Sequence, residues 1–139
     1  MLARRDLSVA EAREKLGRAG ADAAAVEDVV ARAAAAGYLD DAKLAEHVVE
    51  RELTRVPPPA AEWLEAKLEA RGLVREVAQA AVRARADRDT VAALVAAYVR
   101  RERERTGARR IYGRLVRLGH APETVEALLG TAGADDGDL

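Results

Sequence analysis

A short pattern of leucine, glycine and spaced apolar residues occurs three times in this chain of 139 residues. In each copy a leucine stands four positions before a glycine, and we call this pair the leucine-glycine motif. The three motifs are Leu16 with Gly20, Leu68 with Gly72, and Leu115 with Gly119. The glycines are 52 and 47 residues apart. Self-similarity at this spacing is typical of helical repeat arrays, in which each unit buries its apolar face only against its neighbours.

Each motif predicts a helix that ends at the glycine and is followed by a second helix. Glycine adopts the left-handed conformation at a helix C-terminus without the steric cost of a Cβ atom. The residues six, nine and ten positions after each glycine are apolar and share one helical face, because a turn takes 3.6 residues. They are Val26, Val29 and Val30, then Ala78, Ala81 and Val82, and finally Val125, Leu128 and Leu129. We expect that face to pack against another helix.

Capping residues mark where the helices begin. Ser8 and Glu11 have the spacing of a capping box, in which each side chain bonds to the other residue's backbone N–H. The later N-caps are expected at Asp22, Asp40, and Asp87 or Asp89. Prolines 57–59 follow Val56 and break the chain, because proline cannot continue a helix, so this segment is predicted to be a stiff spacer. The last expected helix covers residues 122–129.

These signals predict an all-α fold of about eight helices, an elongated and curved tandem array of three-helix repeats. Repeat 1 is expected at residues 1–56 and repeat 2 at residues 57–105, each with three helices. Repeat 3 at residues 106–130 has only two helices. Residues 131–139 contain glycines and aspartates without an apolar period, so we expect a disordered acidic tail there.

Composition argues against several functional classes. The chain has no cysteine, which excludes disulfides and thiolate metal sites and favours a reducing compartment. No apolar run is long enough to span a bilayer and no signal segment is present, so we expect a cytoplasmic protein without membrane contact. His47 and His120 are not clustered with other ligands. We therefore expect a monomer without a metal, a cofactor or a catalytic residue.

Positive charge is concentrated in one segment, although the whole chain has a net charge of −1. Residues 100–117 hold eight arginines and only two acidic residues, Glu102 and Glu104. The arginines are Arg100, Arg101, Arg103, Arg105, Arg109, Arg110, Arg114 and Arg117. This excess favours electrostatic docking on an anionic partner. The structural alternative is a solvated helix face whose charges pair with one another.

A second set of cations follows the motifs. The residue five positions before each motif glycine is basic, namely Lys15, Lys67 and Arg114, and equivalent positions of a stacked array lie along one surface. We therefore predict a strip of cations, and we include Arg71 among the candidate contacts. The alternative is that these long side chains only cover the shoulder of a core helix. Trp63 has the chemistry of an interface anchor, but core packing is the favoured explanation.

The segment Gly37–Arg51 resembles the signature of the RecX family of bacterial recombination regulators. That signature reads Gly-x-Leu-Asp-Asp-x-x-Phe-Ala followed by an arginine, and Leu39, Asp40 and Asp41 match it here. Leu44 stands at the phenylalanine position, and the segment 56–59 replaces a joint rich in glycine and basic residues. Residues 2–8, with Glu11 and Leu16, resemble the opening of the family, and the repeat order covers about residues 2–129.

The resemblance implies a non-enzymatic protein that binds the RecA recombinase. Family members lodge along the groove of the RecA nucleoprotein filament and limit its assembly, ATPase and strand exchange in DNA repair and recombination. Single-stranded or double-stranded DNA would be at most a weak direct partner. The alternative is a DNA-binding helical module with no recombinase partner, which predicts binding to naked DNA that falls steeply with salt. The net charge of −1 counts against this alternative.

Overall fold

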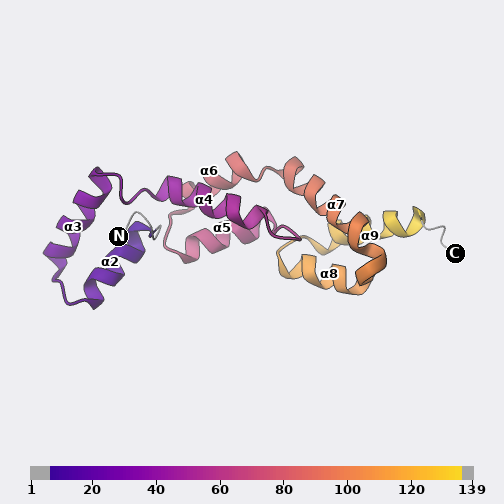
Figure 1. Cartoon of the computed structure of the whole chain (residues 1–139), viewed down its shortest axis with the longest axis horizontal. Helices are drawn as coiled ribbons and strands as arrows, with labels where there is room; N and C mark the ends of the chain where they lie inside the picture. Colours follow the sequence, from indigo (N-terminus) through magenta and orange to yellow (C-terminus); the bar gives the residue numbers. More distant parts are fainter. Residues whose placement is uncertain (1–6, 136–139) are drawn as a thin grey trace. The chain divides into compact units, whose positions relative to one another are not determined.

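The computed structural model describes residues 7–135, which contain eight α-helices and no strand (Figure 1). The helices are α2 (Val9–Arg18), α3 (Ala23–Ala35), α4 (Asp41–Leu53), α5 (Ala61–Ala70), α6 (Arg75–Arg85), α7 (Arg88–Thr106), α8 (Ala108–Arg117) and α9 (Pro122–Asp135). The expected all-α fold is confirmed, and neighbouring helices pack as in a helical repeat array. None of these helices combines the length and the apolarity needed to cross a lipid bilayer.

The helices form two compact units. The first unit contains the described residues up to Val49 together with Glu65–Arg85, and the second contains Glu50–Leu64 together with the residues from Ala86 onward. Two of the three boundaries between the units therefore fall inside α4 and α5, and the third lies between α6 and α7. Compact units and sequence repeats divide a chain by different criteria, so the repeat boundaries expected at residues 56, 105 and 130 stay a prediction.

All three leucine-glycine motifs have the same backbone structure. The residue after each glycine donates its N–H to the carbonyl of the motif leucine, and the glycine N–H donates to the carbonyl three residues earlier. The first of these bonds joins Ala21 to Leu16 at 3.3 Å, Leu73 to Leu68 at 3.3 Å and His120 to Leu115 at 3.1 Å. The glycines have φ angles of 101°, 93° and 94°. This is the Schellman arrangement, so the prediction that each helix ends at its glycine is confirmed.

The helices that end in the motifs, α2, α5 and α8, share one register, and we call them the motif helices. Each has ten residues, and the residue before each stands eight positions before the motif leucine: Ser8, Ala60 and Gly107. Four residues further on, every motif helix has a buried apolar side chain: Ala12, Leu64 or Ile111. The sequence repeat is therefore also a structural repeat.

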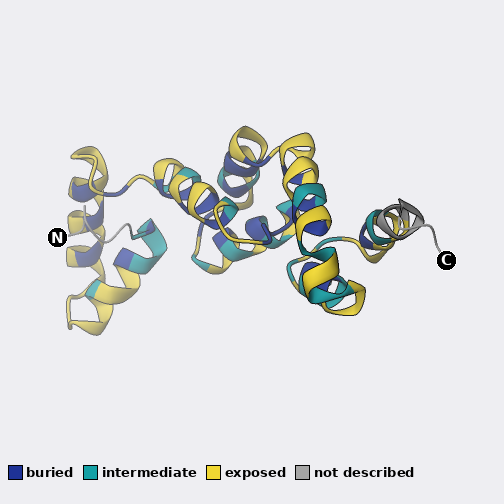
Figure 2. Ribbon diagram, turned by 45° about the vertical axis from the view of Figure 1, so that its right-hand side comes forward, coloured by how far each residue is buried: buried dark blue, intermediate teal, exposed yellow. Residues whose placement is uncertain are grey.

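The helices after the first two motifs, α3 and α6, bury most of their expected faces (Figure 2), whereas in α9 only Val125 is buried and Leu128 and Leu129 are half-buried. In α3 the buried residues are Val26, Val30 and Ala33, which form one core cluster with Ala12 and Leu39. Val29 was expected on this face, but it is 42% exposed. The reason is that α3 packs mainly against α2, so only a narrow stripe at positions i, i+4 and i+7 is covered.

Side chains cap the helices as the sequence predicts. The capping box of Ser8 and Glu11 has both of its hydrogen bonds. Asp22 and Asp40 each accept a hydrogen bond from the backbone N–H three residues later, at 2.8 and 3.1 Å. Of the two candidate caps for α7, Asp87 makes the equivalent hydrogen bond, at 3.2 Å.

At the other end of the chain, α9 continues to Asp135, past its expected end at residue 129, because no proline stops it. Residues 131–135 of the expected acidic tail are therefore helical, and residues 136–139 lie outside the described residues.

The turns of the second and third motifs meet the start of an earlier motif helix. In the first unit, Ser8 Oγ donates to the Arg71 carbonyl at 2.7 Å, and a Cβ atom on Gly72 would collide with Ala10 Cβ. In the second unit, the Ala60 N–H donates to the Leu118 carbonyl at 2.9 Å. A Cβ atom on Gly119 would lie 3.0 Å from Trp63 Cβ. We call this repeated contact the turn joint.

The proline segment differs from the expected spacer. Residues 57–60 are buried in the second unit. The Pro58 carbonyl accepts a hydrogen bond from His120 Nε2, with the two atoms 2.8 Å apart. The spacer prediction was wrong because it considered only backbone stiffness, whereas the prolines also supply apolar surface that packs beside the third motif. His120, which the sequence predicts to be a structural or surface residue, has a structural contact here.

Alanine substitution of the motif glycines tests the turn joint. Gly20→Ala is expected to destabilise the protein by about 1 kcal/mol, because only the left-handed backbone is strained and no atom lies within 4 Å of the added Cβ. Gly72→Ala adds a steric collision with Ala10, so we expect a loss of about 2–4 kcal/mol. Urea unfolding measures both. Ala10→Gly should restore part of the loss in Gly72→Ala, and equal losses for both glycines without any such rescue would contradict the joint.

Candidate partner-binding surface

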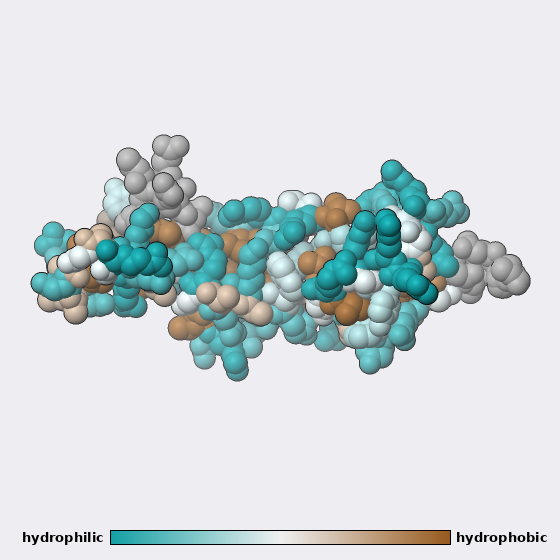
Figure 3. Space-filling view, turned by 90° about the horizontal axis from the view of Figure 1, so that it is seen from below, coloured by the Kyte–Doolittle hydropathy of each residue, from teal (hydrophilic) through white to brown (hydrophobic). Residues whose placement is uncertain are grey.

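The positively charged segment forms the end of α7 and all of α8, both in the second unit. Helix α8 packs against α7 and α9, and its Ile111 and Leu115 are completely buried. Because these two residues lie one turn apart, the opposite side of α8 faces solvent. Arg109, Arg110 and Arg117 are exposed there. In Figure 3, which views the molecule from below the view of Figure 1, hydrophilic side chains gather over this region.

Two arginines of the segment bind groups of their own unit. Arg103 Nη1 donates to the Leu129 carbonyl at 2.9 Å, which attaches α7 to α9. Arg114 Nη1 donates to the hydroxyl of Tyr98 at 2.9 Å, and Tyr98 is almost fully buried. This hydrogen bond raises the pKa of Arg114 above its usual value. Both side chains therefore have a structural role.

Glu102 partly neutralises two more arginines. Its Oε2 lies 3.6 Å from Arg101 Nε and 3.8 Å from Arg105 Nη1, and both arginines are more than half exposed. Exposed ion pairs of this length contribute little to stability and are screened by salt. The structural alternative from the sequence, a solvated face with internal pairing, therefore describes this part of α7.

Four arginines of the segment have no such partner. Within residues 7–135, no acidic group forms an ion pair with Arg100, Arg109, Arg110 or Arg117, and all four are exposed. Three of them belong to α8. They are the cations whose guanidinium groups can bind a partner without first breaking a contact of the folded chain.

The start of α8 is electrostatically unfavourable for the helix itself. No side chain caps it and its first turn has no acidic residue, whereas α2, α3 and α7 each have a side-chain N-cap. Arg109 and Arg110 instead lie next to the positive end of the helix macrodipole, which costs about 0.3–1 kcal/mol for each cation. Helix stability does not explain these two arginines, so their position favours a role in binding.

The other predicted cations are distributed over both units. Lys15 is exposed on α2 and Lys67 is half-buried on α5, both in the first unit, whereas Arg114 belongs to the second unit. The proposed strip of three equivalent cations therefore stays a prediction.

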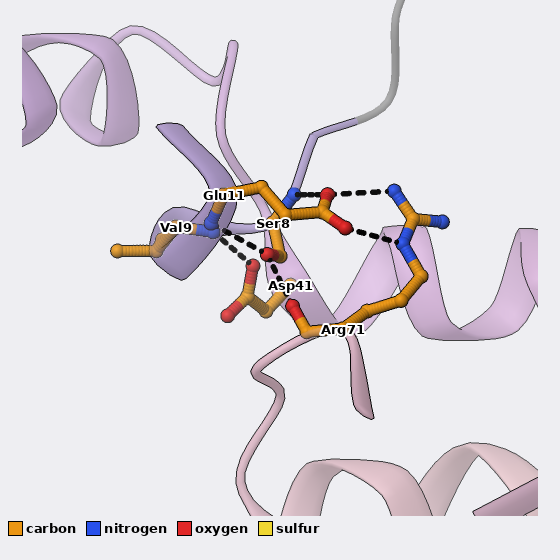
Figure 4. A network of polar contacts seen from close by, with 5 residues as sticks. All are labelled: Ser8, Val9, Glu11, Asp41 and Arg71. Atoms are coloured by element: carbon orange, nitrogen blue, oxygen red, sulfur yellow. Dashed lines mark hydrogen bonds and ion pairs between the residues drawn. The ribbon is translucent and has the colours of Figure 1, made fainter. Parts of the chain in front are cut away.

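Arg71, the remaining candidate contact, is bound within the first unit (Figure 4). Its Nε and Nη2 each lie 2.8 Å from one oxygen of Glu11, so the two side chains form a bidentate pair. Both are only about a quarter exposed, at 27% and 28%. Glu11 also accepts from the Ser8 N–H, and the hydrogen bonds from Arg71 hold the pKa of Glu11 below its usual value. The sequence could not show this pair, because its members are 60 residues apart.

The residues that resemble the RecX signature have structural roles in this chain. Leu39 is buried in the core cluster of the first unit, and Asp40 caps α4. Asp41 Oδ1 accepts from the Val9 N–H at 2.9 Å, so it joins the start of α4 to the start of α2. All three contacts are internal to the first unit, so these residues help to build its fold.

Comparison of the chain with models of known protein families, with curated proteins and with solved structures gives no match. Within residues 7–135, no group of three or more histidine, aspartate or glutamate side chains is arranged to hold a metal ion. The geometric evidence for a site is therefore the exposed arginine surface of α8 and the adjoining end of α7.

The pair between Glu11 and Arg71 makes stability depend on pH. Because the pKa of Glu11 is lowered in the folded protein, its stabilising charge acts above the unfolded-state pKa and is lost as the pH falls through the folded-state pKa. Glu11→Gln keeps a capping acceptor but removes the charge. We expect it to lower the free energy of unfolding by about 1–2 kcal/mol at neutral pH, and this difference should disappear as the pH falls through the folded-state pKa of Glu11.

Urea unfolding over a pH series measures this difference. Glu14→Gln is the matched control, because Glu14 forms an exposed pair with Arg18 on the same helix and should have little effect. A deficit of Glu11→Gln that persists unchanged into acid would contradict the assignment of its cause to the charge.

Proposed function

We propose that this chain is a regulatory protein that binds the RecA nucleoprotein filament and inhibits its assembly, ATPase and strand exchange. The observation that supports this proposal most directly is the exposed surface formed by Arg109, Arg110 and Arg117 on α8. These three arginines form no ion pair within residues 7–135. The resemblance of Gly37–Arg51 to the RecX signature supports the identity of the partner. The structural repetition of the motifs supports a binding protein rather than an enzyme.

The repeat register explains why this surface is available. Ala10 at the start of α2 meets the turn of the second motif, and Trp63 at the start of α5 meets the turn of the third motif. The equivalent residues at the start of α8 are Arg109 and Arg110. Within the described residues no further glycine turn follows to cover them. The starts of α2 and α5 each meet the turn of a later motif, whereas the equivalent start of α8 is free to meet another molecule.

Arginine suits an anionic filament. Its guanidinium group is always charged and donates in a planar fork that matches carboxylates and phosphates. A filament repeats its acidic and phosphate groups along its length, so a cationic surface is steered to it and can be held there. A protein bound in this way bridges neighbouring recombinase subunits, which either fixes them or blocks the addition of the next subunit.

The direct test is the single-stranded-DNA-dependent ATPase of the recombinase with this protein titrated in. We expect inhibition at stoichiometric amounts. The triple variant Arg109→Glu, Arg110→Glu and Arg117→Glu should need at least about tenfold more protein, since each lost charged contact is worth about 1 kcal/mol or more. Its helicity by circular dichroism should not fall, because all three side chains are exposed and glutamate is favourable at the start of α8.

The matched control reverses three exposed cations elsewhere, by the substitutions Arg32→Glu, Arg83→Glu and Arg88→Glu. It changes the net charge equally and should inhibit like the unmodified protein. No inhibition by the unmodified protein at stoichiometric amounts would contradict the proposal. Tight, steeply salt-dependent binding to naked DNA without any effect on the recombinase would instead support a DNA-binding module.

A further inference from the structure

We propose that Gly113 is the point at which the sugar-phosphate backbone of a nucleic acid strand lies closest to α8. The inference rests on the proposed function, because it names the part of the filament that the arginine surface contacts. It assigns a specific position to a residue that neither the charge pattern nor the leucine-glycine motifs identify.

Gly113 lies at the centre of the solvent-facing side of α8. The helical period places it opposite the buried Ile111 and Leu115. Arg109 precedes it by four residues and Arg117 follows it by four, so all three lie along the same face. Arg110, three residues before it, borders the same position. The glycine, which is itself half-buried, thus leaves a point without a side chain between exposed arginines.

Nothing inside the protein requires glycine at this position. Glycine in a helix interior is less stable than alanine, and Gly113 is not among the glycines with a positive φ angle. A Cβ atom there would meet only Arg117 Nη1 at 3.5 Å, an ordinary contact with the end of a flexible side chain. The equivalent residues of the other motif helices are Glu14 and Ala66. The repeat fold therefore accepts larger side chains at this position, and a contact from outside the chain is the remaining physical reason for glycine.

The composition of this face fits a phosphodiester backbone better than a protein partner. Protein interfaces have an apolar centre with aromatic anchors and a polar rim. Here the centre is glycine, and three of the residues around it, Arg109, Arg110 and Arg117, are cations, whereas the one apolar neighbour on the face, Val116, is half-buried. Arginines bind phosphate oxygens through charge-assisted hydrogen bonds. The missing side chain at Gly113 lets the strand approach near enough for arginines on both sides to reach it.

The experiment is fluorescence anisotropy of the full chain with a labelled single-stranded oligonucleotide at several salt concentrations. Gly113→Ala should raise the melting temperature and yet weaken binding several-fold. Its salt dependence should equal that of the unmodified protein, because no cation is lost. Arg117→Gln should instead lower the slope of log K against log salt by about 0.7, the value for one phosphate contact on a single strand.

Gly17→Ala is the matched control. Gly17 also lies inside a motif helix, is exposed and has nothing within 4 Å of an added Cβ atom. The arginines beside it, Arg13 and Arg18, differ from those of α8 because they form ion pairs with Glu27 and Glu14. This variant should raise the melting temperature and leave binding unchanged. Oligonucleotide binding by Gly113→Ala equal to that of the unmodified protein would overturn the inference.

The recombinase ATPase assay separates this inference from the proposed function. If Gly113→Ala loses inhibition of the recombinase but binds the oligonucleotide normally, the occupant of the face is protein, and the nucleic acid assignment is overturned. If Gly113→Ala binds the oligonucleotide more weakly while the unmodified protein never inhibits the recombinase, the inference stands and the proposed function fails. If the unmodified protein does not bind the oligonucleotide even at low salt, the inference fails on its own.

Discussion

The turn joint is the contact on which the arrangement of the helices depends. Every motif glycine ends its helix in a left-handed turn. At Gly72 and Gly119 the absence of a Cβ atom also lets the start of an earlier motif helix pack against the turn. The carbonyl before each of these glycines accepts a hydrogen bond from that helix start. Glycine at these two positions therefore allows both the left-handed backbone conformation and the close packing of a neighbouring helix. Gly20, which no earlier motif helix meets, has only the first requirement.

Internal contacts divide the arginines into those with a structural role and those available for binding. In the first unit, Arg71 reinforces the joint by pairing with Glu11. In the second unit, Arg103 and Arg114 bind groups on α9 and α7. The arginines of the α8 surface have no such contact, and two of them weaken the helix that carries them. Charged residues that destabilise their own helix and form no ion pair within the protein are expected at surfaces that bind another molecule.

The sequence was sufficient for features that depend on neighbouring residues. The helix ends at the motif glycines and the caps at Ser8 and Asp22 follow from local backbone chemistry, and the structure has them. Features that depend on distant residues were not predictable. The bidentate partner of Glu11 lies 60 residues away, and the exposure of Val29 depends on how many helices cover α3. The arginine segment was visible as a charge excess, but only the contacts show which of its members are free to bind.

The measurement that tests this account most directly is amide hydrogen exchange of the chain, alone and bound to the recombinase filament on single-stranded DNA. We expect the largest new protection in α8, around Arg109, Arg110 and Gly113. The amides of α2 should exchange equally in both samples, because the turn joint already covers the start of that helix. Protection that leaves α8 unchanged, or that is found only in the first unit, would contradict the claim that the start of the last motif helix is the binding surface.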